Sequence, residues 1–236
     1  ASYFYLNPVS FLLTGVHGQF ENVCLYFLLL AVRLAVQPVL DENGHRRAWL
    51  WATAAFVLKH LTFFGLVLVV RHLFDRQRAL RLLILSVVLF AVSFLPYWRG
   101  AGEEIVSNVL GYRSHSAPYG LAALNLRWLG PLFVAALWAY SFILANRRLS
   151  TKMLLGSLFF LTFTPGFGPQ YLILPIAFGA LRPSKAFFIY TFTAGAHLLG
   201  SYHNMGIEAF SWISLWAVWL AAAYWWGSEQ FKRRAK

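Results

Sequence analysis

The chain has 236 residues, of which 59% are hydrophobic and only 12% are charged, with a mean hydropathy of +0.59. A soluble globular domain usually carries about 25% charged residues, so this composition excludes an ordinary soluble protein, and it excludes a disordered chain as well. The single cysteine, Cys24, excludes an internal disulfide framework and a cysteine-based zinc site. The net charge of +12 could indicate nucleic-acid binding, and the positions of the basic residues decide that question.

The hydrophobic residues fall into blocks separated by polar connections. Several blocks reach the roughly 20 residues that a helix needs to cross a hydrocarbon core of about 30 Å, and helices satisfy their own backbone hydrogen bonds in lipid. We therefore expect an all-α, polytopic membrane protein with about eight or nine transmembrane or half-membrane helices. The expected segments are Asn22–Leu40, Ala48–Val70, Ala79–Tyr97, Trp128–Asn146, Thr151–Thr164, Gln170–Leu181, Ala186–Tyr202 and Ala209–Gly227. Residues 1–236 then form a single transmembrane domain.

The first polar sequence, His17-Gly-Gln19-Phe-Glu21-Asn22, stands between an apolar stretch and an expected helix. Glu21 and Asn22 are suited to a helix start, where side-chain oxygens meet free N–H groups, so this sequence can be a simple cap. In the alternative interpretation, His17 and Gln19 are donors beside a helix N-terminus and bind an anionic headgroup.

The segment Ala48–Val70 is flanked by basic residues at both ends, Arg47 and Arg71. Lys and Arg prefer the cytoplasmic side of a membrane, so a single crossing would leave one flank on the wrong side. A hairpin that turns at Lys59-His60 puts both flanks inside. Each arm would have about a dozen residues, or roughly 18 Å of helix, and would line a protein-walled cavity.

An intramembrane lysine beside a histidine is a candidate site by default. In a setting of low dielectric constant, Lys59 would hold a phosphate, and His60 would share this role or lie in the core. The simpler alternative is a plain helix from which Lys59 extends toward the membrane interface.

The stretch 98–127 is too long for a simple connection and is expected to be a loop with a short amphipathic surface helix, Ile105–Leu110. Glu103 and Glu104 would precede that helix and complement its positive end. Tyr112 and Arg113 follow it, and Arg113 would either clamp a phosphate or sugar acid or remain a solvated loop charge.

The sequence Thr164–Tyr171 reads as a rigid turn between two short apolar helices, because its prolines stop both helices and its glycines permit unusual backbone conformations. Such a turn would let Gln170 and Tyr171 reach into a cavity. Elsewhere, His197 is expected to be a satisfied core residue, and Arg33 to extend to the cytoplasmic interface.

The basic residues cluster in the connections that the hairpin topology places on one side, so we interpret the net charge as an orientation signal. The C-terminus is then cytoplasmic, the polar sequences gather on the outer face, and no argument for nucleic-acid binding remains. The clusters are Arg46-Arg47, Arg71–Arg81, Arg147–Lys152, Arg182–Lys185 and Lys232–Lys236.

A set of short motifs occurs in a fixed order along the chain: Asn7-Pro8, His17–Glu21, Lys59, Leu95-Pro96, Tyr112-Arg113-Ser114, Tyr119–Leu121 and Pro169–Leu172. In this order they resemble bacterial GT-C glycosyltransferases, the multi-spanning mannosyltransferase-like proteins related to the sugar transferases of the GPI and dolichol pathways. The resemblance covers nearly the whole chain. It depends on the order of the motifs, because each motif alone is unspecific.

The resemblance implies a GT-C-like fold in a bacterial inner membrane. It also implies inverting transfer of a sugar, with a mannose-like hexose favoured, from a polyprenyl-phosphate donor to a lipid-linked or envelope acceptor on the outer face. Lys59 would contact the donor phosphate, and His17 and Gln19 would line the same cavity. No cofactor is implied, and no divalent metal is indicated.

Two departures from the family affect the catalytic base. The family more often has Asp where this chain has Glu21, and its catalytic acidic residue lies in a first outer loop to which nothing here corresponds. We therefore expect this sequence to be the later part of such an enzyme, with the base outside it or supplied by a second chain, and with Glu21 as the weak candidate within it. The alternatives are a non-catalytic GT-C-like subunit of a larger complex and, less favoured, a transporter.

Overall fold

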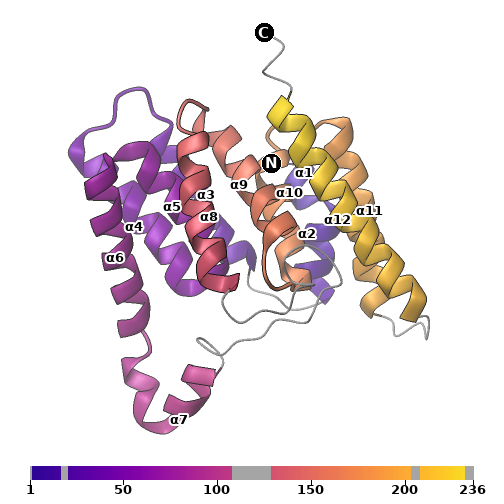
Figure 1. The fold of residues 1–236 in the computed structure, drawn as a ribbon, viewed down its shortest axis with the longest axis horizontal. Coiled ribbons are helices and arrows are strands. Elements are labelled where there is room, and N and C mark those ends of the chain that lie inside the picture. Colours follow the sequence, from indigo (N-terminus) through magenta and orange to yellow (C-terminus); the bar gives the residue numbers. More distant parts are fainter. Residues whose placement is uncertain (1, 17–20, 108–128, 203–207, 232–236) are drawn as a thin grey trace.

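The computed structural model describes residues 2–16, 21–107, 129–202 and 208–231, and these are built from helices (Figure 1). Every segment expected from its hydropathy contains a helix. The α-helices are α1 (Ser2–Tyr5), α2 (Pro8–Phe11), α3 (Glu21–Ala35), α4 (Glu42–Leu58), α5 (Phe63–Leu73), α6 (Arg76–Val92), α7 (Trp98–Ile105), α8 (Leu129–Ile143), α9 (Leu149–Phe163), α10 (Ile173–Gly179), α11 (Lys185–Tyr202) and α12 (Glu208–Phe231). Short helices of other types are η1 (Leu12–Val16, a π-helix) and the 3₁₀ turns η2 (His60–Thr62), η3 (Leu95–Tyr97) and η6 (Pro169–Leu172).

The expected break at Lys59 is confirmed. Lys59 takes an extended conformation, φ −155° and ψ 115°, at the end of α4, and the turn η2 leads from it into α5. The helices α4 and α5 then pack against each other, so the chain reverses direction here. A continuous helix through this segment, the alternative considered above, does not occur.

The stretch 98–127 begins with a helix that was not expected, α7 (Trp98–Ile105), and Glu103 and Glu104 are in its last turn. The expected helix Ile105–Leu110 lies partly outside the described residues. A helix begins here because the 3₁₀ turn η3, with Pro96 in its first turn, starts the winding that α7 continues. Figure 1 shows α7 at the far end of α6, projecting beyond the rest of the helices.

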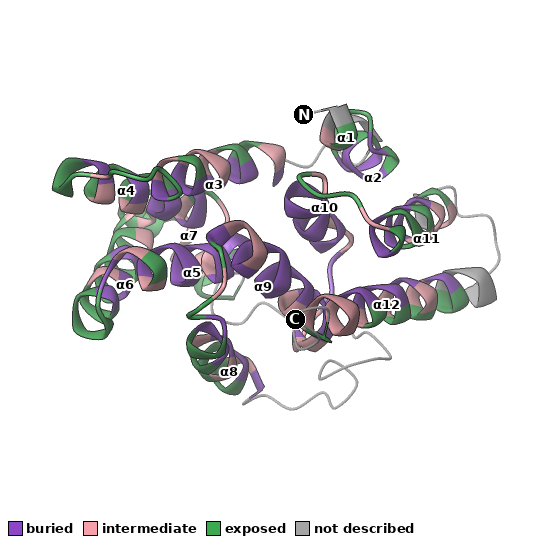
Figure 2. Ribbon diagram, turned by 90° about the horizontal axis from the view of Figure 1, so that it is seen from above, coloured by how far each residue is buried: buried purple, intermediate pink, exposed green. Residues whose placement is uncertain are grey.

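The core is formed by helices that are apolar on every side. Every residue of α10 is buried, as are Phe64–Val70 of α5, and α9 is buried over most of its length. Figure 2 shows these helices in the middle of the molecule, with exposed faces on α6, α8 and α12 around them. The close approach of α10 to α12 depends on Gly179, where an added Cβ would lie 2.3 Å from the ring of Trp225.

The surface is rich in large apolar side chains. In α6, Leu80, Ile84 and Val88 are exposed, and in α11 Phe192 is 77% exposed. Among the described residues, one continuous helical stretch, Arg76–Ile105, is long and apolar enough to cross a membrane by length and composition. Shorter apolar helical stretches are His60–Leu73, Leu129–Ile143 and Leu149–Phe163.

The connections that carry the basic clusters lie at one end of the molecule, which we call the basic end (Figure 1). Contacts link them from one helix terminus to the next. They are Arg78–Glu42 between the starts of α6 and α4, Lys152–His72 between the start of α9 and the end of α5, Arg71–Phe142 between the ends of α5 and α8, and Arg147–Gln230 between the α8–α9 connection and the end of α12. The turn at Lys59 lies at the opposite end, because α4 runs away from the basic end and α5 returns to it.

Candidate functional site

A buried ion pair joins two of the residues singled out from the sequence, Glu21 and Lys59. The Lys59 Nζ donates to the Glu21 Oε1, although the residues are 38 positions apart in the chain. The Glu21 side chain is 1% exposed and the Lys59 side chain is 27% exposed. Glu21 is the first residue of α3, but its carboxylate binds the ammonium at the α4–α5 turn instead of serving only as a helix cap.

The local structure explains why the pair forms. The extended backbone of Lys59 releases its side chain from the helical path of α4, and η2 packs against α3, where Glu21 begins the helix. The turn is held by the Thr62 hydroxyl, which donates to the Lys59 carbonyl at 3.1 Å. A carboxylate buried among apolar helices requires such a partner, because an isolated charge there is strongly unfavourable.

The pair leaves polar atoms that could bind a ligand. The Glu21 Oε2 and the Asn22 Oδ1 are buried and have no hydrogen-bond partner among the described residues. Asn22 also donates through its amide nitrogen to the Thr14 hydroxyl, which orients the free oxygen. Buried acceptors of this kind are normally satisfied, so these oxygens are suited to a hydroxyl or ammonium donor.

An apolar cleft of about 440 Å³ is lined by Asn22, the residue that follows Glu21 in the chain, but not by Glu21 or Lys59. It runs between α3 and α10 with α1 at its edge, and Asn22 lies at its polar end. The other lining residues are Phe4, Val23, Leu25, Tyr26, Leu29, Ala177, Ala180 and Leu181. The site therefore combines a buried carboxylate, a partly exposed ammonium and an apolar cleft that is reached at Asn22, and this combination suits an amphiphile with a polar head and a hydrocarbon tail.

The structure describes only some of the remaining site residues expected from the sequence. His17, Gln19, Tyr112 and Arg113 lie outside the described residues. His60 follows Lys59 in η2.

Tyr171, one of the two residues expected to reach into a cavity from the α9–α10 turn, is buried in the core instead. The Tyr171 ring lies in the core between Phe160 and Phe167, with ring centroids 5.3 Å and 6.4 Å away. The Gln170 side chain folds back over Gly168. The expectation failed because an apolar ring beside a tight turn is stabilised more by burial than by exposure to a polar cavity.

One structural interpretation is confirmed, the place of His197 in the core, whereas the cytoplasmic position of Arg33 stays a prediction. His197 is buried, with its Nδ1 2.9 Å from the Ser214 hydroxyl of α12, so it belongs to the core. Arg33 is exposed near the basic end, in the last turn of α3.

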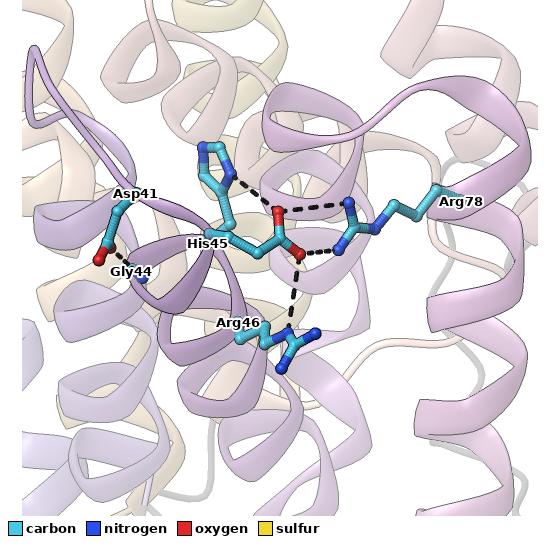
Figure 3. A network of polar contacts seen from close by, with 6 residues as sticks. Asp41, Gly44, His45, Arg46 and Arg78 are labelled. Atoms are coloured by element: carbon cyan, nitrogen blue, oxygen red, sulfur yellow. Dashed lines mark hydrogen bonds and ion pairs between the residues drawn. The ribbon is translucent and has the colours of Figure 1, made fainter.

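A second polar network at the basic end was not anticipated from the sequence (Figure 3). The Glu42 carboxylate accepts from the Arg78 guanidinium and also faces Arg46 and His45. The hydrogen bond from Arg78 holds the pKa of Glu42 below its usual range. This network ties the start of α4 to the start of α6.

The N-terminus of α6 contributes a second carboxylate at this end. Asp75 accepts from the backbone N–H groups of Gln77 and Arg78 at 2.9 Å and 3.0 Å, and these bonds lower the pKa of Asp75. Such capping is the ordinary role of Asp before a helix. Both carboxylates thus stabilise helix termini and carry no sign of ligand chemistry.

Comparisons with known proteins identify no relative. No protein-family model matches the chain, no curated protein matches its sequence, and no solved structure matches its fold. Within the described part of the chain, no group of three or more His, Cys, Asp or Glu side chains is arranged to hold a metal ion. The functional argument therefore depends on the residues of the site itself.

Proposed function

We propose that the chain is a polytopic membrane protein with its basic end in the cytoplasm. The argument rests on the distribution of side chains: large apolar residues face outward along α6, α11 and α12, and contiguous exposed apolar surface of this kind indicates contact with lipid. The concentration of Lys and Arg at one end has the asymmetry expected from the positive-inside rule. The shorter apolar helices then serve as half-membrane or tilted elements inside the helical assembly.

We further propose that this protein is a membrane glycosyltransferase of the GT-C type, which transfers a sugar, with a mannose-like hexose favoured, from a polyprenyl-phosphate donor. The observation that carries the proposal is the Glu21–Lys59 ion pair, together with the apolar cleft that Asn22, the residue after Glu21, lines. A polyprenyl-phosphate sugar has an anionic phosphate next to a long hydrocarbon chain. The phosphate would bind the Lys59 ammonium, and the hydrocarbon chain would lie in the apolar cleft. The acceptor would be lipid-linked or part of the envelope.

The chemistry assigns separate roles to the two members of the pair. In an inverting transfer, a carboxylate takes the proton of the acceptor hydroxyl while the anomeric carbon gains oxocarbenium character. The free Oε2 of Glu21 is the candidate for that base within this chain. The bond that breaks leaves a lipid phosphate, and the Lys59 ammonium would stabilise its negative charge without donating a proton.

Sugar transfer by membranes that contain Lys59 variants tests the proposal. We expect Lys59→Met to abolish transfer from a polyprenyl-phosphate mannose donor, and Lys59→Arg to keep part of it, because the guanidinium still binds phosphate. The matched control is Lys185→Met, which removes an exposed lysine at the basic end and should leave activity unchanged. Full activity in a folded Lys59→Met protein would refute the phosphate role.

One observation favours a non-catalytic GT-C-like subunit as a second candidate. Glu21 and Lys59 neutralise each other in this structure, which suits a pair whose role is to hold α3 against the α4–α5 turn. A subunit of this kind would show no sugar transfer alone, and transfer would appear only when a partner chain supplies the base. Activity of the purified chain without a partner would exclude this alternative.

A further inference from the structure

The basic end contains a second cavity, which shares Leu29 and Leu181 with the apolar cleft but not Asn22 or the Glu21–Lys59 pair. Its volume is about 680 Å³, and it lies between the last turns of α3 and α5 and the first turn of α9. Its polar lining includes Arg33, His72 and Arg148. Its apolar lining comes mainly from one face of α3, namely Leu29, Val32, Ala35 and Val36, with Leu149 and Leu181 from the neighbouring segments.

Positive charge at this cavity is not balanced by the carboxylates that the structure places at the same end. Glu42 binds Arg78, Asp41 and Asp75 cap α4 and α6, and Glu229, near the end of α12, does not line the cavity. Within the described part of the chain, neither Arg33 nor Arg148 forms an ion pair. Two guanidinium groups facing one cavity without a counter-ion are suited to an anion.

A buried lysine adds a second, independent observation. Lys152 of α9 is only 4% exposed, and its Nζ lies 3.4 Å from the Nδ1 of His72, which lines the cavity. Lys152 therefore adds a positive charge behind the cavity wall, next to His72. His72 lines the cavity together with the two arginines.

The start of α9 completes the set of donors. Arg148 precedes the helix without a side-chain cap, and Leu149 and Ser150 line the cavity. The first N–H groups of a helix have no partners inside it, and together with the helix dipole they favour a phosphate.

We propose that this cavity binds the phosphate headgroup of an anionic phospholipid from the cytoplasmic leaflet, with an acyl chain against the apolar face of α3. A lipid is favoured over free phosphate because the cavity is apolar on the side of α3, where Leu29, Val32 and Val36 follow one another at helical spacing. The inference rests on the membrane location proposed above and is independent of sugar transfer. The bound lipid would bridge α3 and α9 at the basic end.

Lipid binding to the purified full chain in detergent, measured by native mass spectrometry, tests this proposal. We expect dioleoyl-phosphatidylglycerol to bind at least about tenfold more tightly than dioleoyl-phosphatidylcholine, which has the same chains and the same phosphate, because the choline ammonium cancels the negative charge of the headgroup and is repelled by the two arginines. The variant Arg33→Gln/Arg148→Gln should weaken phosphatidylglycerol binding by about tenfold for each arginine. Equal affinity for the two lipids would overturn the proposal.

A matched double variant distinguishes lipid binding in this cavity from general electrostatic attraction of the lipid to the basic end. Arg47→Gln/Arg182→Gln removes the same charge from exposed residues that do not line the cavity, and should leave phosphatidylglycerol binding unchanged. An equal loss in this control would overturn the assignment to the cavity. Binding of inorganic phosphate as tight as that of the lipid would overturn the acyl-chain contact.

A single variant keeps the test valid if the double variant does not fold. Val36 is half exposed on the cavity wall, so Val36→Glu is expected to fold and to place a carboxylate beside the bound phosphate. It should weaken phosphatidylglycerol binding while sugar transfer persists. Unchanged lipid affinity in Val36→Glu would refute the proposed position of the headgroup.

Discussion

The two charges of the Glu21–Lys59 pair are buried to different depths, so we expect the loss of one charge to lower the free energy of unfolding more than the loss of the other. Lys59→Met leaves the carboxylate, 1% exposed, without its ion partner and should lower the free energy of unfolding by about 3–5 kcal/mol. Glu21→Gln leaves an ammonium that still reaches solvent, so the loss should be about 1–3 kcal/mol. Thermal or chemical unfolding in detergent measures both, and equal losses would contradict the burial argument.

The double variant Glu21→Gln/Lys59→Met isolates the interaction itself. Because it removes both charges, it should be less destabilised than the sum of the single variants. Additive effects would mean that the ion pair contributes no coupling and that the single variants act through packing alone.

At the basic end, the carboxylates of Glu42 and Asp75 predict how stability depends on pH. Their pKa values are lowered in the folded protein, by Arg78 for Glu42 and by backbone N–H groups for Asp75. Stability from these groups is therefore fully present above the ordinary carboxyl pKa of about 4 and is lost as the pH falls through the lower folded values. The apparent melting temperature of Glu42→Gln should depend less on pH in this acidic range than that of the wild type, and an identical pH dependence would contradict the assignment.

At the scale of elements, the contact between α10 and α12 depends on the absence of a side chain at Gly179. An added Cβ would lie 2.3 Å from Trp225 and 2.8 Å from Phe187, and neither ring can move easily within the core. Gly179→Ala should therefore destabilise the protein by about 1–3 kcal/mol through overpacking. The measurement is thermal unfolding, and a stability equal to that of the wild type would show that α10 and α12 can separate without cost.

Gly227 of α12 is the matched control for that substitution, because nothing lies within 4 Å of the position of its Cβ. Gly227→Ala should be neutral or stabilise the helix by up to about 1 kcal/mol, since alanine is the better helix former. Destabilisation of both variants by the same amount would indicate a general effect of glycine replacement instead of a clash at Gly179.

At the scale of the whole molecule, the proposed membrane topology predicts that the two ends of the helices face opposite sides of a membrane. In a Cys24→Ala background, Asn43→Cys at the basic end should be protected from an impermeant thiol reagent in intact cells, and Ser107→Cys beyond α7 should react. Both positions are exposed in the structure, so accessibility alone does not separate them. Labelling of Asn43→Cys from outside would reject the hairpin topology.

The elements of this fold are largely predictable from the sequence, because long apolar blocks specify helices and basic residues mark their ends. The break at Lys59 is predictable because both flanks of the segment Ala48–Val70 are basic. Both flanks are therefore expected on the same side of the membrane, and the segment must turn back in its middle. The position of α7 is not predictable, because Glu103 and Glu104 suit the start of a following helix as well as the end of a preceding one.

The candidate site was predictable only as separate residues. Glu21 and Lys59 stand out in the sequence because charged side chains are rare inside apolar segments. Their pairing could not be predicted, because 38 residues separate them and the geometry depends on how η2 packs against α3. The burial of Lys152 was hidden by its place in a basic cluster, where neighbouring positively charged residues suggest a solvated end.

The sequence by itself determined the helical class, the breaks between helices and the separation of basic from other polar residues, because each of these follows from composition within a short window. The tertiary structure alone decided which charges meet. A carboxylate in an apolar interior must find a partner or lose its charge, and Lys59 satisfies Glu21 only because the chain reverses at the end of α4. The same packing of α3, α5 and α9 gathers Arg33, His72 and Arg148 around one cavity, although each of them begins or ends a different helix.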